Sequence, residues 1–164
     1  MLSAMAMSMT PAMQAEIKIL PGNDKCVDCG SAHPQWASVT FGALMCLECS
    51  GAHRGMGVHI SFVRSVTMDS WNEKQLALMK AGGNADLVAF WKRHKVDPRM
   101  PHNAKYHEPA SELYKDRLRA KVEGKPLPTE LPARKAAPAS CYDAPGGSGM
   151  SAGGFGGGDR GKGA

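Results

Sequence analysis

The sequence predicts one α+β domain, in which a small three-stranded sheet pinned by a metal-binding cysteine cluster is surrounded by about five helices. Three observations support this fold. Four cysteines have the spacing of metal ligands, short runs of strand-forming residues lie among and just after them, and helical periodicity covers most of the remaining chain up to residue 125. A chain of 164 residues has room for one ordinary domain but not for two large ones.

The first helix is expected directly after Thr10, which is a suitable N-cap. Pro11 would take the first helical position, where its missing N–H leaves no hydrogen bond unmade. Apolar residues then recur at helical spacing until Pro21-Gly22 ends the helix: Met13, Ile17 and Leu20. We expect residues 1–9, which precede this helix, to be disordered.

Three short strands are expected where cysteines, glycines and short apolar runs replace the helical pattern. The candidate strands cover residues 36–41, 43–45 and 61–66. Gly42 suits the turn between the first two of them.

Four further helices are expected. One starts near Leu47, inside the cysteine-containing region. Ser70-Trp-Asn-Glu73 has the spacing of a capping box and precedes a helix over residues 74–80, which Gly82-Gly83 ends. The last two helices begin near residue 84 and span residues 109–123. Each has an apolar stripe, made of Leu87, Phe90, Trp91 and His94 in the former and of Ala110, Tyr114, Leu118 and Val122 in the latter.

The composition of the chain changes after residue 125. Five prolines between residues 126 and 145 indicate an extended linker, and ten of the 19 glycines lie within residues 141–164. Such a segment cannot bury enough apolar surface to offset its ordering entropy. We therefore expect residues 10–125 to form the domain and residues 126–164 to be a Pro-rich, then Gly-rich disordered tail, in which Cys141 has no assigned role.

Composition also limits the compartment and the partners. No run of about 18 apolar residues is present, which excludes a membrane span. The first ten residues lack the basic start of a secretory signal, so the cytosol or nucleus, where thiols stay reduced, is the default expectation. Most of the net charge of +5 resides in the C-terminal helices, since residues 26–80 sum to zero and residues 81–125 to +4. This excess could favour an acidic partner or an anionic membrane surface.

Four of the five cysteines form the pattern Cys26-x2-Cys29-x16-Cys46-x2-Cys49. Each C-x-x-C pair can place two thiolates on one side of an ion, and two pairs complete the tetrahedron that zinc prefers. Unrelated cysteines or a redox pair are the alternative. With four sulfur ligands no position remains for water, so we expect one structural Zn²⁺ rather than a catalytic one.

Two further readings of this region carry less weight. His33, His53 and His59 could replace a cysteine ligand, but four cysteines leave no need for them, and we expect them to be surface or hydrogen-bonded residues. A nucleic-acid partner is not expected. The region is neutral by side-chain count, and residues 47–57 offer only one arginine to contact phosphate.

Arg54 follows the last of these cysteines by five residues. On a helix, five residues turn the side chain by roughly 140° from the metal-facing side. Arg54 would then project outward from a metal-anchored helix that Gly55 and Gly57 terminate. Such an arginine suits contact with another molecule, and the alternative is an ordinary solvated or salt-bridged arginine.

Several segments together resemble a known family. Cys26-Val-Asp-Cys29 is followed by Pro34-Gln-Trp-Ala-Ser-Val and then by a continuous stretch from Cys46-Leu-Glu-Cys-Ser-Gly-Ala-His-Arg54-Gly-Met-Gly to Met-Asp-Ser-Trp71. These segments resemble the ArfGAP zinc-finger domain, whose pattern C-x2-C-x16-C-x2-C-x4-R the chain fits without a gap. The resemblance spans about residues 13–124 and is closest to the subgroup that carries this domain at the N-terminus of a Golgi-associated Arf regulator.

The resemblance implies a GTPase-activating protein for Arf-family small GTPases in their GTP-bound state. Arg54 matches the arginine finger of the family, which stabilises charge on the phosphoryl oxygens from outside the GTPase. GTP and Mg²⁺ would belong to the partner, so the chain is expected to complete an active site rather than to be an enzyme itself. The resemblance also implies a role in vesicle coat and membrane traffic, in the cytoplasm and peripherally at Golgi membranes.

Trp36, Ile60, Phe62 and Arg64 fall where members of the family support or contact the GTPase. For Trp36 the alternative is core packing beside the zinc ion, and Arg64 could instead pair with Asp69. A different class of function is a non-catalytic zinc adaptor that binds a protein or an acidic lipid. Residues 126–164 show no apolar face of the kind that senses membrane curvature, so recruitment to membranes would use a partner or a longer form of the chain.

Overall fold

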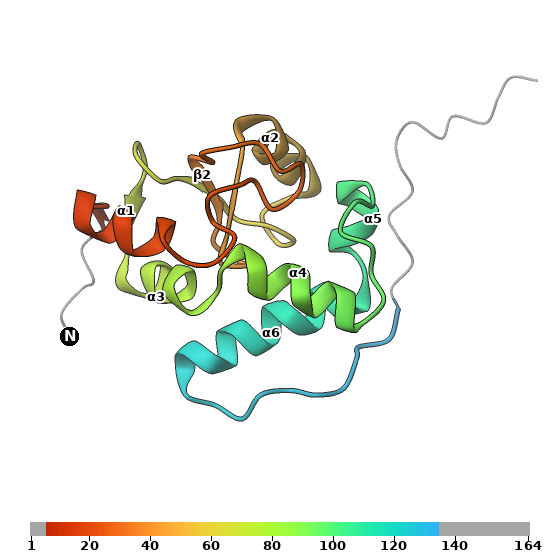
Figure 1. Ribbon diagram of the computed structural model, residues 1–164. Coiled ribbons are helices and arrows are strands. Elements are labelled where there is room, and N and C mark those ends of the chain that lie inside the picture. Colours follow the sequence, from red (N-terminus) through yellow and green to blue (C-terminus); the bar gives the residue numbers. More distant parts are fainter. Residues whose placement is uncertain (1–5, 135–164) are drawn as a thin grey trace, which may run out of the picture.

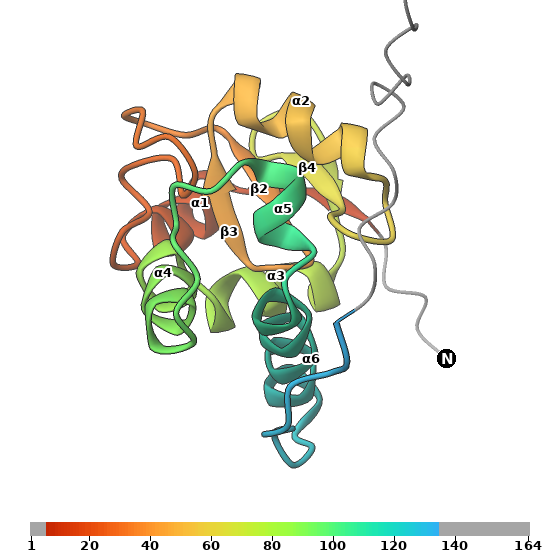
Figure 2. The same cartoon turned by 90° about the vertical axis from the view of Figure 1, so that its right-hand side faces the viewer.

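The computed structural model describes residues 6–134, and residues 1–5 and 135–164 lie outside that description. Within the described range, six helices surround a three-stranded antiparallel sheet (Figure 1). Figure 2 shows helix α2 (Leu47–Met56) above this sheet and helices α3 (Glu73–Ala81) and α6 (Pro109–Glu123) beneath it. The predicted α+β class, with a small sheet among helices, is confirmed.

The sheet has the strand order β3–β2–β4. The central strand β2 (Trp36–Ser38) pairs with β3 (Ala43–Met45) on one side and with β4 (Val63–Ser65) on the other. All three predicted strands are present, two of them shorter than predicted. The turn between β2 and β3 requires Gly42, because its φ is +57° and a Cβ there would lie 2.7 Å from the carbonyl oxygen of Leu78.

The five predicted helices are present, and a sixth was not predicted. Helix α1 (Pro11–Lys18) begins after Thr10, whose hydroxyl accepts a hydrogen bond from the N–H of Met13 at 3.3 Å. Helix α4 (Asn84–Arg93) follows Gly83, and α6 ends at Gly124 in the left-handed conformation. The additional helix, α5 (His102–Tyr106), is only five residues long.

The start of α3 differs from the predicted one. Its N-cap is Asn72, whose side chain accepts a hydrogen bond from the N–H of Gln75 at 2.9 Å, while the Gln75 side chain accepts one from the N–H of Asn72 at 3.0 Å. Ser70, the predicted cap, belongs instead to the short strand β5 (Ser70–Trp71). Two overlapping sequence patterns satisfy the capping-box rule, and the structure uses the second.

Residues 7–9 differ from the disorder expected for residues 1–9. Strand β1 (Met7–Ser8) pairs antiparallel with β5, with Met7 opposite Trp71. Met9 is buried in the core cluster that contains Trp71. This segment is therefore ordered by contacts with residues about sixty positions away, which its own sequence pattern does not reveal.

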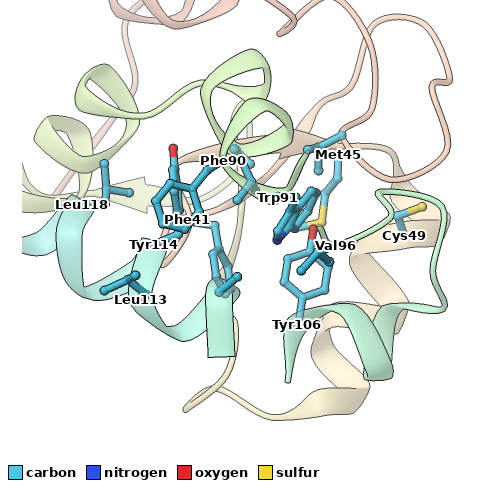
Figure 3. Close-up of a cluster of buried hydrophobic side chains, with 14 of the residues drawn as sticks. Phe41, Met45, Cys49, Phe90, Trp91, Val96, Tyr106, Leu113, Tyr114 and Leu118 are labelled. Atoms are coloured by element: carbon cyan, nitrogen blue, oxygen red, sulfur yellow. The ribbon is translucent and has the colours of Figure 1, made fainter. Parts of the chain in front are cut away.

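Buried apolar side chains form two clusters on opposite faces of the sheet. The larger cluster lies toward α4, α5 and α6 and is drawn in Figure 3. It includes Phe90 and the fully buried Trp91, so the predicted stripe on α4 is a core face. The Nε1–H of Trp91 donates to the hydroxyl of Ser111 at 2.8 Å, which satisfies its one polar atom. The smaller cluster consists of Met9, Ile17, Ala37, Val39, Leu44, Val66, Trp71, Leu76 and Met79.

The described residues after α6 fold back along that helix. Arg117 donates to the carbonyl oxygen of Pro128 at 2.7 Å, and Arg134 lies 3.1 Å from the carboxylate of Glu108. Residues 126–134 contain no helix or strand. The remainder of the predicted tail, including Cys141, lies outside the described residues. Among the described helices, none has the length and apolarity needed to span a bilayer.

Candidate functional site

The four predicted cysteine ligands converge. The Sγ atoms of Cys26, Cys29, Cys46 and Cys49 all lie within 4.8 Å of one another, and those of Cys29 and Cys46 are 3.5 Å apart. A tetrahedral ion with metal–sulfur bonds of about 2.3 Å requires sulfur–sulfur separations of roughly 3.8 Å. The number, type and spacing of these donors therefore fit a four-thiolate metal site.

Two different backbone structures present the sulfur atoms. The first pair lies on a tight loop, in which the N–H of Cys26 donates to the carbonyl of Ser31 at 2.8 Å and the N–H of Gly30 donates to the carbonyl of Cys26 at 3.0 Å. The second pair begins helix α2. Cys46 is its N-cap, and the Cys46 Sγ accepts a hydrogen bond from the N–H of Cys49 at 3.4 Å. An ion held by these sulfurs would fix the first turn of α2.

The thiols of the cluster differ in acidity. Hydrogen bonding from Ser31, whose hydroxyl lies 3.0 Å from the Cys29 Sγ, lowers the pKa of Cys29 to about 6. Burial raises the pKa values of Cys26 and Cys49. The two buried sulfurs therefore ionise at neutral pH only when a cation compensates their charge, which is the behaviour of metal ligands.

The three histidines considered as substitute ligands lie outside the cysteine cluster. His33 and His59 are exposed. His53 is fully buried on α2, and both of its ring nitrogens are in hydrogen-bonding contact, 2.7 Å from the hydroxyl of Ser61 and 2.8 Å from a carboxylate oxygen of Asp28. Of the two outcomes expected for these residues, surface exposure holds for the first two and hydrogen bonding for His53.

Arg54 is exposed near the C-terminal end of α2. Its guanidinium carbon lies 4.8 Å from the centre of the Trp36 ring, which is the geometry of a cation–π contact. Trp36 is half-buried and packs on the larger core cluster, so it gives the arginine a firm support. The structure therefore brings Arg54 and Trp36 together, with Arg54 five residues along α2 from Cys49.

Ile60 and Arg64 lie in different surroundings. Ile60 is half-buried against the same core cluster as Trp36. Arg64 is on β4 opposite Ala37, and the strand register places the side chains of Arg64 and Trp36 on opposite faces of the sheet. The Arg64 guanidinium lies over Phe62 at 4.8 Å and reaches Asp69 only at 4.0 Å. Arg64 is thus not gathered with Arg54 around Trp36.

A buried polar network beside the cysteine cluster was not predicted from the sequence. We call it the polar clamp; its members are Ser38, Ser61, His53, Asp28, Lys105 and Tyr106. The hydroxyls of Ser38 and Ser61 are 2.7 Å apart. The Ser61 hydroxyl also contacts one ring nitrogen of His53, and the other ring nitrogen contacts Asp28. The other carboxylate oxygen of Asp28 accepts hydrogen bonds from Lys105 at 2.6 Å and from the Tyr106 hydroxyl at 2.7 Å. One sequence signal existed: an acidic residue placed inside a C-x-x-C pair.

Asp28 is the electrostatic centre of the polar clamp, and its side chain is only 2% exposed. Burial alone would raise its pKa, but the hydrogen bond from His53 and the positive charge of Lys105 outweigh that effect and hold the pKa of Asp28 far below its usual range. The carboxylate therefore stays ionised and accepts all three donors. Asp28, Cys49 and His102 also lie close enough to share an ion, but these hydrogen bonds occupy Asp28, and Cys49 belongs to the cysteine cluster.

Comparison with known proteins gives consistent results. Residues 12–123 match the family model ArfGap, described as "Putative GTPase activating protein for Arf". The chain is 48% identical over 103 residues to the ADP-ribosylation factor GTPase-activating protein GCS1 of Saccharomyces cerevisiae, covering 63% of this chain and 29% of that protein. It is 45% identical over 105 residues to ADP-ribosylation factor GTPase-activating protein 3 of Bos taurus, covering 63% and 20%.

Among solved structures, one similar chain is described as a "putative GTPase activating protein for ADP ribosylation factor" from Cryptosporidium parvum. It is 34% identical with a TM-score of 0.58, and the match covers 69% of this chain and 87% of that one. The match to the curated relatives spans less than a third of their length. Because the family model covers more than half of the sequence and coincides with the folded domain, the chain belongs to the ArfGap family.

Proposed function

We propose that this protein is a GTPase-activating protein for an Arf-family small GTPase and that Arg54 is its arginine finger. One observation carries the proposal: an exposed arginine projects from a helix whose first turn carries two of the four clustered cysteines. Membership of the ArfGap family and the names of its relatives support it.

Arg54 would act on the GTP-bound partner during hydrolysis. The partner's GTP, Mg²⁺ and water-positioning group perform the reaction, and the guanidinium stabilises negative charge that builds on the phosphoryl oxygens. This chain contains no G-x-x-x-x-G-K-[ST] phosphate loop of its own, which agrees with the partner binding the nucleotide. The chain then completes an active site that it does not itself contain.

The contact between Arg54 and Trp36 leaves the arginine side chain able to move to the partner's nucleotide. A cation–π contact at an exposed site contributes about 0.5–1 kcal/mol. Bidentate hydrogen bonds from arginine to phosphate oxygens are stronger, particularly where water is excluded. Moving from the Trp36 ring to a phosphate group therefore lowers the free energy of the Arg54 side chain. In the absence of a partner, Trp36 holds this side chain in place.

We propose that one structural Zn²⁺ occupies the cysteine cluster. Cys26, Cys29, Cys46 and Cys49 would fill its tetrahedron and leave no position for water or substrate. When bound, the ion supplies charge compensation for the thiolates and a cross-link between the loop that carries Cys26 and Cys29 and the start of α2. In this proposal the metal holds the helix that presents Arg54, and it takes no part in hydrolysis.

The surface around Arg54 is the proposed partner site. Trp36 contacts Arg54, and Ile60 would add apolar surface from the side of the larger core cluster. Arg64 would add a charge at the far face of the sheet if the partner reaches around β4. By analogy with the resemblance above, we further propose a cytoplasmic protein that associates peripherally with Golgi membranes and acts in vesicle traffic. The functional domain in this proposal is residues 10–125, extended at its start by strand β1.

The proposal is tested by replacing the arginine. We expect Arg54→Ala to lower stimulated GTP hydrolysis by about 10³-fold or more, because fingers of this kind contribute 10³–10⁵ in rate. Arg54→Lys should recover little, because an ammonium group lacks the planar fork of donors. The measurement is single-turnover hydrolysis by GTP-loaded Arf, with zinc content and melting temperature measured alongside.

The matched control is Arg99→Ala. Arg99 is an exposed arginine in the loop between α4 and α5, and its described hydrogen bonds are all to Asp97. This variant should keep full activity. A folded, zinc-loaded Arg54→Ala protein with normal activity would exclude Arg54 as the finger. Unaltered protein that has no effect on GTP turnover would instead leave the adaptor function, in which a protein or acidic lipid is bound.

A further inference from the structure

We propose that the polar clamp is a second anchor for helix α2 and that His53, through Asp28, positions Arg54 for the partner's nucleotide. This inference rests on the proposed function, because it concerns how the same arginine is held. His53 and Asp28 are positioning residues in this proposal, since neither is expected to touch the nucleotide.

The metal site alone secures only one end of α2. Cys46 and Cys49 lie at its first turn, whereas Arg54 is five residues beyond Cys49 and near the helix end. Between and beside them lie Gly51 and Gly55, which lower the intrinsic stability of a helix. A helix held at its start and weakened by glycine frays at the other end, where Arg54 is.

The polar clamp attaches that other end to three separate parts of the chain. The Nδ1 side of the His53 ring contacts Ser61, which follows α2, and Ser61 contacts Ser38 on strand β2. The Nε2 side contacts Asp28 in the loop between the first two cysteines. Asp28 in turn accepts hydrogen bonds from Lys105 on α5. The His53 ring is therefore held to the sheet, to the cysteine loop and to α5 together.

The burial of His53 determines where Arg54 points. Consecutive helical residues differ in direction by about 100°. Because the His53 ring is fully buried toward the sheet, the next side chain must leave the helix along the protein surface, where Trp36 meets it at 4.8 Å. A misplacement of about 1 Å in a catalytic group costs on the order of 100-fold in rate, so a loose end of α2 would matter.

The test compares His53→Leu with His94→Leu. His94 is a half-buried histidine at the end of α4, and its ring centre lies 4.4 Å from that of Phe90 at a tilt of 41°. It lies outside the proposed partner site, so it offers the same substitution elsewhere. Three quantities are measured on the full chain: zinc content, amide hydrogen exchange of residues 53–57, and single-turnover GTP hydrolysis by Arf over a range of concentrations of the activator.

For His53→Leu we expect one zinc per chain, amide exchange at residues 53–57 faster by about tenfold, and a maximal hydrolysis rate lower by about 10- to 100-fold. The half-saturating concentration should change by less than about twofold, because the contact surface stays in place. His94→Leu should leave all of these quantities unchanged. Unchanged exchange and an unchanged maximal rate in folded His53→Leu protein would overturn the proposal.

Two further outcomes are decisive. If His53→Leu does not fold, Ser61→Ala carries the test, because it removes one contact of the ring and keeps His53 and Asp28; faster exchange at residues 53–57 supports the anchor, and unchanged exchange overturns it. If the exchange accelerates as expected but the unaltered protein does not stimulate Arf, the anchor stands and the proposed function fails.

Discussion

Gly42 and Gly51 occupy opposite environments. Gly42 has a φ of +57°, and a Cβ there would meet the carbonyl oxygen of Leu78 at 2.7 Å and the backbone of Gly82 at 3.1 Å. Gly51 lies within α2, and a Cβ built on it has nothing within 4 Å. The fold requires a glycine at position 42, because a side chain would not fit there. At position 51, glycine only lowers the stability of the helix.

We therefore predict that Gly42→Ala lowers the free energy of unfolding by about 1–3 kcal/mol, because it adds backbone strain and a steric contact with α3. Gly51→Ala should raise it by up to about 1 kcal/mol, since alanine favours the helix and fits there. Urea denaturation of the two variants measures both effects. Equal midpoints for the two proteins would contradict the account of the β2–β3 turn.

At this scale the sequence predicts some site residues and not others. The convergence of the four cysteines could be predicted because it follows from their spacing along a short stretch of chain, whereas the proposed role of Arg54 comes from the resemblance to the family and stays a prediction. Asp28 could not be predicted, because its partners His53 and Lys105 lie 25 and 77 positions away and only the fold brings them together. The role of this buried carboxylate can be assigned only when its hydrogen-bond donors are known.

Helices were predictable where their ends carry clear signals. Thr10-Pro11 and Gly124 mark the start of α1 and the end of α6 as expected. Helix α5 was missed because five residues cannot show an apolar period, and its position is set by contacts of Lys105 and Tyr106 with Asp28. Short elements that are stabilised by tertiary contacts leave little trace in the local sequence.

The two candidate caps of α3 give a test at the level of one element. We predict that Asn72→Ala lowers the free energy of unfolding by about 1 kcal/mol, because it leaves the N–H of Gln75 without its acceptor. Ser70→Ala, at the cap position that the sequence suggested, should change it by less than about 0.5 kcal/mol. Thermal or urea unfolding distinguishes the two variants. A larger loss of stability in Ser70→Ala would show that Ser70, not Asn72, caps the helix.

Across the whole molecule, the cysteine cluster and the polar clamp join the same parts of the chain. The cluster connects the loop of Cys26 and Cys29 to the start of α2. The clamp connects that loop, through Asp28, to the end of α2 and to α5. With an ion bound, the chain around the sheet would be cross-linked at two neighbouring places.

We predict that metal removal unfolds this domain. Zinc binding to small structural sites contributes about 10–16 kcal/mol, which is as large as the whole stability of a typical domain at about 5–15 kcal/mol. Chelator treatment, or Cys46→Ser, should abolish the cooperative unfolding transition. Serine is itself a good N-cap, so the loss in Cys46→Ser would report the missing ligand rather than the helix start. A zinc-free variant with native circular dichroism would contradict the structural role of the metal.

The pairing of β1 with β5 has a consequence for the order of events during synthesis. Strand β1 emerges first, but its partner Trp71 follows Cys49 by 22 positions. At about 5–20 residues per second, the ribosome needs roughly one to four seconds to add that interval. All four cysteines of the cluster are synthesised before β5, the strand that pairs with β1. An ion captured on the nascent chain can thus organise the middle of the domain before strand β1 pairs with β5.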